Sequence, residues 1–265
     1  MEQKDLGSIP IVILCGGKGM RLAAHTQNAP KALVEIGQYP ILWHVMRLYT
    51  HHGFRRFILC LGHLGDQIKR FFVDGDQADQ GDITLKQPDL RQDVIPATDC
   101  SDLEITFAET GEDTNTGGRL KRVEQYMGSG HFLATYVDGL FDLNPIRLLE
   151  FHKSHGKLAT LTAVKPTSPF GILRLGDNGL VEQFREKPRL DMWINGGFFV
   201  FERDVFDWIG ENDDLERNTF VRFAEAGQIM AFRHEGYWAC MDTYKDTVIL
   251  SDLWENGQAP WRIWE

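Results

Sequence analysis

Short apolar runs alternate with amphipathic stretches along the first third of the chain. Residues 9–14 form a continuous apolar run that ends at two glycines, which is typical of a strand buried on both faces of a parallel sheet. Apolar residues then recur with helical spacing over residues 41–49, between a proline and a glycine. A second strand is predicted over residues 56–61 and a short helix over residues 66–72. This order predicts an α/β fold with a doubly wound, mostly parallel sheet.

The pattern changes at residues 74–100, which are polar and show no periodicity. So long a segment inside a compact domain is expected to be a loop or an interface arm. Short apolar runs between Gly and Asn over residues 171–201 predict a small added β portion. The other strands and helices are expected over residues 103–108, 120–126, 132–137, 145–155, 159–164, 220–226 and 245–254. Because no repeat or linker interrupts the chain, one domain is predicted over residues 1–265.

The charge balance limits the possible partners. The 28 Lys and Arg residues stand against 38 Asp and Glu residues, so the formal net charge is −10. Nucleic acids and anionic membranes both require a basic face. We therefore expect neither as a partner, although a local cluster of cations would still bind a small anionic ligand.

The cysteines and the N-terminus bear on the compartment. Cys15, Cys60, Cys100 and Cys240 are far apart and form no C-x-x-C pair, so reduced thiols are expected rather than a zinc site or a disulfide framework. The polar N-terminus lacks the apolar segment of a signal peptide, and no window approaches the ~20 apolar residues of a membrane span. These features predict a cytoplasmic protein.

Two histidines have a spacing that places them on one face of a helix. His152 and His155 lie three residues apart in the helix predicted over residues 145–155. No neighbouring cysteine or acidic residue completes a metal site with them in the sequence. They are therefore predicted to be ordinary helix residues rather than metal ligands.

A glycine-rich turn follows the first predicted strand directly. Residues 14–22 read LCGGKGMRL, and glycines in such a turn let backbone N–H groups approach a phosphate chain. Arg21 adds a charge whose geometry matches phosphate oxygens, and Lys31 adds a second cation. The turn is not a P-loop, because it contains no G-x-x-x-x-G-K-[ST]. It is not a clean dinucleotide fingerprint either, because Leu22 occupies the place of the third glycine. By itself the turn is equally compatible with any α/β protein.

Together, however, the two segments resemble a known family. G-G-x-G-x-R-L at 16–22 and P-K-x-L-V-x-I at 30–36 are similar to the motifs of the sugar-1-phosphate nucleotidyltransferases. Further matches are T-G at 110–111, T-G-G-R-L-K-R at 116–122, Y-x-D-G at 136–139, E-K-P at 186–188, I-N-G-G-F-F at 194–199 and M-D-T at 241–243. The resemblance covers residues 10–265 and implies a Rossmann-like, GT-A-like nucleotidyltransferase sheet. The run at 116–122 and the C-terminal residues 253–261 resemble the branch that uses CTP.

The resemblance implies a reaction between two anions. CTP and α-D-glucose 1-phosphate would give CDP-glucose and pyrophosphate, by in-line attack of a sugar-phosphate oxygen on the α-phosphorus. Catalysis of this kind depends on positioning and on charge neutralisation. A phosphate monoester is already mostly dianionic at neutral pH, since its second pKa is about 6. The site is therefore expected to contain Lys, Arg and Mg²⁺, and the family suggests a homo-oligomer.

The resemblance also assigns roles to particular residues. The catalytic residues would be Arg21, Lys31, Asp138 and Lys187, and Asp138 and Asp242 would hold Mg²⁺, which commonly takes one or two carboxylates. The nucleotide would contact Leu14, Gly16, Gly17, Gly19, Arg21, Lys31, Thr116, Gly117 and Gly118, the last two forming a turn against the nucleobase. The sugar phosphate would contact Gly171, Glu186, Lys187, Asn195 and Gly196.

Two departures from the family keep alternatives open. Met20 stands where the family usually has Thr or Ser, and residues 74–100 match the CTP-using branch poorly. A thymidylyl- or uridylyltransferase, or an enzyme for another sugar 1-phosphate, is the first alternative. A non-catalytic regulatory subunit that binds a sugar nucleotide is the second, and it is opposed by the intact Asp138 and Asp242.

Overall fold

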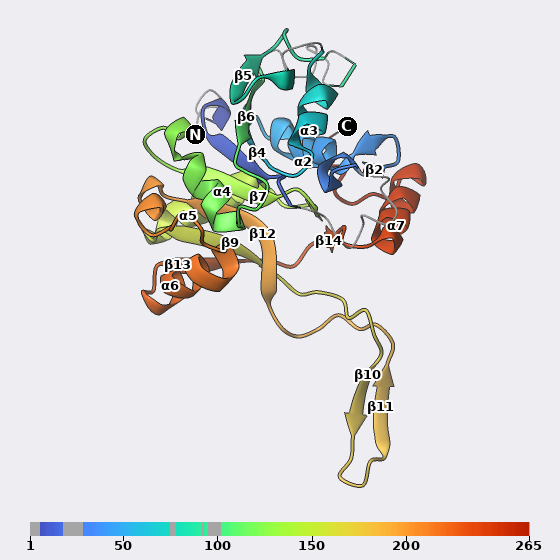
Figure 1. Cartoon of the computed structure of the whole chain (residues 1–265). Helices are drawn as coiled ribbons and strands as arrows, with labels where there is room; N and C mark the ends of the chain where they lie inside the picture. Colours follow the sequence, from blue (N-terminus) through green and yellow to red (C-terminus); the bar gives the residue numbers. More distant parts are fainter. Residues whose placement is uncertain (1–5, 18–28, 75–77, 92, 95–101, 265) are drawn as a thin grey trace.

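An eight-stranded sheet in the order β13-β9-β12-β7-β1-β4-β6-β5 forms the centre of the molecule (Figure 1). The computed structural model describes residues 6–17, 29–74, 78–91, 93–94 and 102–264. The strands of this sheet are β1 (Pro10–Leu14), β4 (Arg56–Leu61), β5 (Ile83–Lys86), β6 (Glu104–Glu109), β7 (Phe132–Tyr136), β9 (Ala159–Val164), β12 (Ile194–Phe201) and β13 (Ile229–His234).

Short paired strands and helices complete the described chain. The two-stranded sheets pair β2 (Glu35–Ile36) with β3 (Tyr39–Pro40), β8 (Gly139–Phe141) with β14 (Trp238–Cys240), and β10 (Ile172–Leu175) with β11 (Val181–Arg185). The α-helices are α2 (Ile41–His51), α3 (Gly65–Phe72), α4 (Thr116–Arg122), α5 (Pro145–His155), α6 (Phe220–Glu225) and α7 (Tyr244–Glu255). Short 3-10 turns span Lys31–Leu33, Glu124–Tyr126 and Arg203–Asp207, and a π-turn spans Leu215–Thr219. None of the helices in these ranges is long and apolar enough to cross a membrane.

The central strands are mostly parallel. β1 pairs in parallel with both β4 and β7, and β4 pairs in parallel with β6. β12 runs antiparallel between β7 and β9, and β5 is an antiparallel edge strand. The carboxyl ends of β1, β4, β6 and β7 therefore meet at one edge of the sheet, where ligands bind in open α/β sheets.

Both faces of the sheet are covered, as the first apolar run predicts. Ile11 and Ile13 of β1 belong to one core cluster, while Val12 and Leu14 belong to the other. Residues of α2, α3, α5 and α7 pack in the first cluster, and residues of α4 and α6 pack in the second. Figure 1 shows α2 and α3 on one side of the sheet and α4 on the other. The predicted doubly wound α/β fold is confirmed.

Local sequence signals account for the helix boundaries in α5. The Oδ1 atom of Asn144 accepts a hydrogen bond from the backbone N–H of Ile146 at 2.9 Å, and Pro145 occupies the first helical position. The helix ends at His155, and the next residue, Gly156, has a φ of +62° in the left-handed region. The prediction over residues 145–155 is confirmed.

The predicted boundaries are wrong in two places. Part of the loop expected over residues 74–100 is the strand β5, in which Ile83 and Leu85 face Phe107 and Ile105 of β6. Its two apolar residues are too few to give a recognisable alternation. The helix expected over residues 120–126 is α4, which begins earlier, at Thr116, and continues only as a 3-10 turn.

The β portion expected over residues 171–201 divides into two parts. β12 is a full member of the central sheet and not an addition to it. Its glycines explain the irregular pattern, because the register against β9 shifts between Asn195 and Phe199 and Gly197 has a φ of +90°. A Cβ atom on Gly197 would lie 2.5 Å from Cδ2 of Tyr136.

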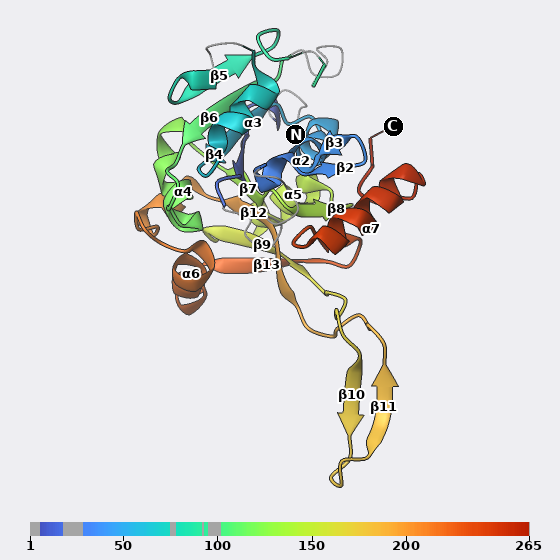
Figure 2. The same ribbon diagram turned by 45° about the vertical axis from the view of Figure 1, so that its right-hand side comes forward.

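The hairpin β10–β11 is the second part, and it extends away from the sheet as an arm (Figures 1 and 2). Leu173 pairs with Phe184 across the hairpin, and Leu175 pairs with Val181. All four of these side chains are exposed. A two-stranded hairpin is marginal by itself, so this apolar surface is a candidate for contact with another chain.

Candidate active site at the carboxyl ends of the parallel strands

A pocket of about 330 Å³ opens beyond the carboxyl ends of β1 and β7. Its lining residues are Leu14, Cys15, Gly16, Gly17, Lys31, Thr114, Asn115, Thr116, Arg119, Tyr136, Val137, Asp138 and Asp214. The structure thus brings together Leu14, Gly16, Gly17, Lys31, Thr116 and Asp138, which were predicted from distant segments. Gly19 and Arg21, together with Met20, lie outside the described residues.

The buried Arg119 holds the glycine turn in place. The residue is only 4% exposed. Its guanidinium donates hydrogen bonds to the carbonyl oxygens of Gly16 at 2.9 Å, Leu61 at 3.0 Å and Gly111 at 2.7 Å. Burial lowers the pKa of Arg119. A Cβ atom on Gly16 would lie 2.1 Å from its Nη1 atom, so close approach to Arg119 requires glycine there. The sequence placed Arg119 in a motif but gave it no role.

One lysine joins the two predicted carboxylates. The Nζ atom of Lys31 lies 2.6 Å from Oδ2 of Asp138 and 2.7 Å from Oδ1 of Asp242, which are 107 and 211 residues away in the sequence. Burial opposes the charge, but the two carboxylates hold the pKa of Lys31 above its ordinary value. The ammonium group therefore stays charged and offsets the negative charges of the two carboxylates near the carboxyl end of β7.

Local structure brings each member of this cluster to its place. Lys31 lies in the 3-10 turn that follows Pro30, and Asp138 follows β7 directly. Asp242 immediately precedes the capped start of α7, where its backbone N–H donates to Oδ2 of Asp246 at 3.1 Å. Three separate turns thus converge on one ammonium group.

The same cluster contains a possible metal-binding set. Carboxylate oxygens of Asp138 and Asp242 and the thiol of Cys240 all lie within 4.8 Å of one another. Burial and the two carboxylates raise the pKa of Cys240, so the thiol stays neutral. The two carboxylates are the hard oxygen donors that suit Mg²⁺. The sequence reading missed Cys240, although it stands only two positions before Asp242.

A polar network lines the opposite wall. The hydroxyl of Tyr136 donates to Glu216, whose Oε2 accepts from Oγ1 of Thr116 at 3.0 Å. The backbone N–H of Leu215 donates to the same Thr116 hydroxyl at 2.9 Å. Asn195 donates to the Tyr136 hydroxyl at 3.4 Å. The network holds two pocket residues in one orientation, and its members Tyr136 and Glu216 were not predicted.

Asn195 and Gly196 reach the site through β12. The antiparallel register pairs Phe198 with Thr135, so the start of β12 lies beside the end of β7. Trp238 donates from its ring N–H to the carbonyl oxygen of Gly196 at 3.1 Å. These two predicted sugar-phosphate residues therefore border the Asp138 region.

The other sugar-phosphate residues lie elsewhere. Gly171, Glu186 and Lys187 flank the two strands of the arm, and within the described chain they do not line the pocket. Glu186 and Lys187 are 60% and 51% exposed. The expected set is thus divided by the structure, because the hairpin extends away from the sheet (Figure 2).

Gly117 and Gly118 are also placed differently from the prediction. They form the first turn of α4 rather than an open turn, and they are not among the described residues that line the pocket. A Cβ atom would lie 2.8 Å from the carbonyl oxygen of Asp213 at Gly117 and 2.3 Å from that of Glu211 at Gly118. Packing against the loop that contains Glu211 and Asp213 explains the absence of side chains.

Comparison with known proteins places this geometry in a family. A family model described as nucleotidyl transferase matches residues 11–257. The chain is 44% identical over 258 residues to the glucose-1-phosphate cytidylyltransferase of Salmonella typhi, covering 96% of this chain and 99% of that protein. It is 28% identical over 230 residues to the UTP–glucose-1-phosphate uridylyltransferase of Synechocystis, covering 82% of this chain and 55% of that protein.

Solved structures agree in fold. HddC from Yersinia pseudotuberculosis superposes with a TM-score of 0.66 at 20% identity, covering 93% of this chain and 99% of that one. The inositol-1-phosphate CTP transferase from T. maritima superposes with a TM-score of 0.61 at 16% identity, covering 94% and 98%. With the fold, the pocket and the matched segment in agreement, this chain belongs to the nucleotidyl transferase family.

Proposed function

We propose that this chain transfers a cytidylyl group from CTP to α-D-glucose 1-phosphate, releasing pyrophosphate and forming CDP-glucose. The observation that carries the proposal is the Asp138–Lys31–Asp242 cluster, which lies at the carboxyl ends of parallel strands. The 44% identity with the Salmonella cytidylyltransferase over nearly the whole chain supports CTP and glucose 1-phosphate as the substrates.

The residues of the pocket supply positioning and charge. The backbone at Gly16 and Gly17 approaches the phosphates of the nucleotide, with Arg119 holding this turn in place. Lys31 carries three N–H donors on a flexible stem, so it reaches a phosphate oxygen from its place between the carboxylates. A bond forms between a sugar-phosphate oxygen and the α-phosphorus as the bond to pyrophosphate breaks. No side-chain nucleophile is required.

Asp138 and Asp242 are the residues that would hold Mg²⁺. Their oxygens lie close enough to share one ion, and both are hard donors. When bound, Mg²⁺ would neutralise negative charge on the phosphates during transfer. The pair also keeps Lys31 oriented toward the pocket.

The arm supports the expectation of a homo-oligomer. Its exposed apolar face is formed by Leu173, Leu175, Val181 and Phe184. A second copy of the chain would cover this face, and Glu186 and Lys187 would then approach sugar phosphate from a neighbouring arm. A cytoplasmic location is proposed from the nucleotide substrates and from the free thiols of Cys15, Cys60 and Cys240.

A screen for pyrophosphate release tests the proposal. The purified chain is incubated with CTP, UTP, dTTP, GTP or ATP against a panel of hexose 1-phosphates, with and without Mg²⁺. We expect the highest turnover with CTP and glucose 1-phosphate, and a loss of at least about 100-fold in Asp138→Asn. The exposed arm variant Glu182→Gln serves as the control and retains turnover.

Other outcomes select the alternatives. Highest turnover with UTP, dTTP or another sugar phosphate would retain the reaction class and overturn the choice of substrates. Binding of a sugar nucleotide without turnover on any pair would favour the regulatory subunit. Full activity in Asp138→Asn would overturn the role of the carboxylate cluster.

A further inference from the structure

A second cluster of potential metal ligands lies at the other edge of the sheet. His131 immediately precedes β7, Glu202 immediately follows the antiparallel strand β12, and His152 comes from α5. Asp138 stands at the opposite end of β7, and a strand advances about 3.3 Å per residue. The seven-residue separation from His131 to Asp138 therefore places this cluster about 20 Å from the nucleotide pocket.

The three side chains converge on a single point. The Nδ1 atom of His131 lies 2.9 Å from Oε1 of Glu202, and the Nε2 atom of His152 lies 3.3 Å from the same oxygen. One ligand atom from each residue lies within 4.8 Å of the other two. A tetrahedral zinc ion with bonds of about 2.0–2.2 Å separates its ligands by about 3.3–3.6 Å, so small side-chain adjustments suffice.

Both imidazole nitrogens that face Glu202 lack a satisfying hydrogen bond. Nδ1 of His131 and Nε2 of His152 are buried atoms without a hydrogen-bond partner among the described residues. The carboxylate oxygen is near enough, but its direction does not meet that of a ring N–H. His152 is only 1% exposed, so solvent does not replace the missing partner. A buried polar atom left in this way is costly.

The ring nitrogen of His152 that faces away from Glu202 has a hydrogen-bond partner, as metal-binding histidines require. Its Nδ1 atom lies 2.8 Å from the hydroxyl of Thr160, and Nε2 of His155 lies 2.8 Å from the same hydroxyl. Thr160 can accept a hydrogen bond from both rings. With the proton of His152 on Nδ1, the lone pair of Nε2 faces the cluster, as in metal sites where a second residue fixes the tautomer.

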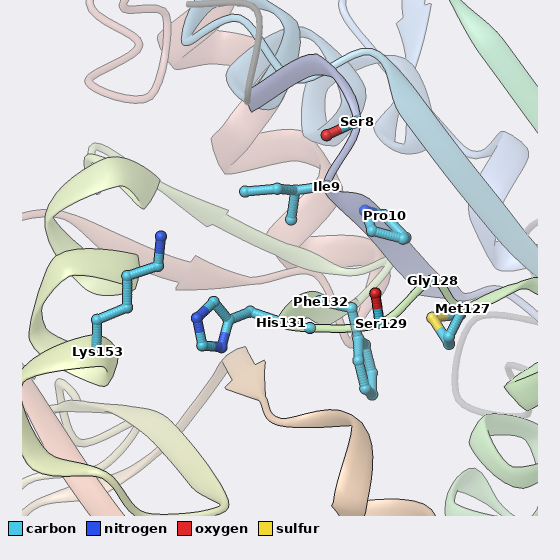
Figure 3. A pocket seen from close by; sticks show the side chains of 10 residues that line it. Ser8, Ile9, Pro10, Met127, Gly128, Ser129, His131, Phe132 and Lys153 are labelled. Atoms are coloured by element: carbon cyan, nitrogen blue, oxygen red, sulfur yellow. The ribbon is translucent and has the colours of Figure 1, made fainter. Parts of the chain in front are cut away.

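One member of the cluster, His131, also lines a pocket of about 300 Å³. Figure 3 shows His131 on the wall of this pocket, between Lys153 and Phe132, with Ser129 nearby. The side chains of His131 and Glu202 are 27% and 31% exposed, while His152 is buried. An ion would therefore reach the cluster from the side of the partly exposed His131 and Glu202.

We propose that His131, His152 and Glu202 form a Zn²⁺ site, separate from the nucleotide pocket, with His131 at the border of this second pocket. Two imidazole nitrogens and one carboxylate oxygen are a recognised zinc donor set that leaves a fourth position for water. The sequence gave no sign of the site, because the acidic ligand and the second imidazole come from segments remote from the His152–His155 pair. The bound ion would tie α5 to the ends of β7 and β12.

Zinc binding by the full chain tests the proposal directly. The Cys240→Ser/Asp242→Asn double variant serves as the background, since it disables the other metal-capable cluster. Equilibrium dialysis against Zn²⁺, followed by elemental analysis, measures the number of ions per chain. We expect one Zn²⁺ per chain, and Co²⁺ in its place should give the intense visible absorption of a tetrahedral site.

Ligand variants are made in the same background. His131→Ala and Glu202→Gln should each weaken Zn²⁺ binding at least 100-fold, because loss of a ligand exceeds the roughly 10–100-fold effect of losing an outer-shell partner. Ser129 lines the same pocket without belonging to the cluster, so the Ser129→Ala variant should bind Zn²⁺ as tightly as the background does. The more exposed His131 and Glu202 are chosen over buried His152, and thermal unfolding of each apo variant confirms that it folds.

Two results would overturn the site. One is the absence of stoichiometric Zn²⁺ in the background variant. The other is Zn²⁺ binding that His131→Ala and Glu202→Gln leave unchanged. Neither result depends on nucleotidyl transfer, so the site fails or stands independently of the proposed function.

Discussion

At the residue scale, the fit between Gly16 and Arg119 determines the shape of the glycine turn. The guanidinium bonds to backbone oxygens from the ends of β1, β4 and β6, so it joins three parallel strands at the edge where the nucleotide pocket opens. Arg119 is thus a positioning residue, and the glycine beside it is required by space rather than by flexibility alone.

Gly16→Ala is expected to destabilise the protein. The new Cβ atom displaces the Arg119 guanidinium and leaves buried carbonyl oxygens without a donor. We expect a loss of about 1–3 kcal/mol in the free energy of unfolding, together with weaker CTP binding. Chemical denaturation and calorimetric titration measure the two effects.

Gly17→Ala is the matched control for this substitution. Among the described residues, a Cβ atom on Gly17 meets nothing within 4 Å, so its effect on unfolding should stay below about 0.5 kcal/mol. Equal destabilisation by both variants would contradict the close-approach explanation.

Lys31→Met tests the charge cluster through the pH dependence of stability. The substitution leaves two neighbouring carboxylates without their shared cation, so we expect a loss of about 2 kcal/mol near neutral pH. The pKa of Lys31 is raised in the folded state. Its contribution is therefore fully present below the unfolded pKa of about 10.4 and is lost as the pH rises through the higher folded value. The difference between wild type and variant should shrink only above about pH 10.5.

The exposed Lys187 provides the comparison. Lys187→Met should change the free energy of unfolding by less than about 0.5 kcal/mol at every pH. A wild-type–variant difference for Lys31 that is already lost below about pH 9 would contradict a raised pKa. Urea unfolding followed by fluorescence measures both variants across the range.

At the element scale, helix starts place functional side chains. α7 begins with a capping box in which Thr243 Oγ1 accepts from Asp246 N–H at 3.3 Å and Asp246 Oδ2 accepts from Thr243 N–H at 2.7 Å. The same Asp246 carboxylate holds the backbone of Asp242. The cap therefore stabilises α7 and orients a member of the Lys31 cluster.

Thr243→Ala and Asn144→Ala separate these two effects. Each removes an N-cap and should cost about 1 kcal/mol of stability. Thr243→Ala should also lower kcat, because Asp246, which holds the backbone of Asp242, loses the hydrogen bond from the Thr243 hydroxyl. Asn144→Ala removes the cap of α5, which contributes no residue to the nucleotide pocket. Thermal unfolding and pyrophosphate release at saturating substrates measure the pair. Equal turnover in both variants would contradict the positioning role of the α7 cap.

At the scale of the whole molecule, the arm predicts assembly. Leu173→Ser/Phe184→Ser removes two apolar side chains that pair on the exposed face of the hairpin. We expect light scattering to show wild-type particles larger than the 30.3 kDa chain and the double variant to shift toward that mass. Gln183→Ser, whose residue pairs with Arg174 in the same hairpin, should keep the wild-type mass. A wild type that is already 30.3 kDa would contradict the proposed oligomer.

The sequence predicted those features that depend on local order. The apolar run ending at Leu14 predicted a strand buried on both faces, and Asn144 followed by Pro145 predicted the start of a helix. The predictions for the short β5 and the glycine-containing β12 were wrong. Both strands form through pairing with their neighbours, and their sequences lack a clear alternation of apolar and polar residues. Lys31, Asp138 and Asp242 were expected through family resemblance, but no local pattern indicated that one ammonium lies between two carboxylates.

The sequence by itself determined the alternation of strands and helices, because the spacing of apolar residues along a short stretch of chain indicates which element forms. Only the tertiary structure decided which distant side chains meet. It joined Lys31 to carboxylates 107 and 211 residues away, placed Gly117 and Gly118 in helix packing, and placed Lys187 next to the β10–β11 hairpin, outside the lining of the pocket. It also brought Glu202 to His131 and His152. The physical reason is that sheet order and register, rather than sequence distance, set which strand ends share an edge.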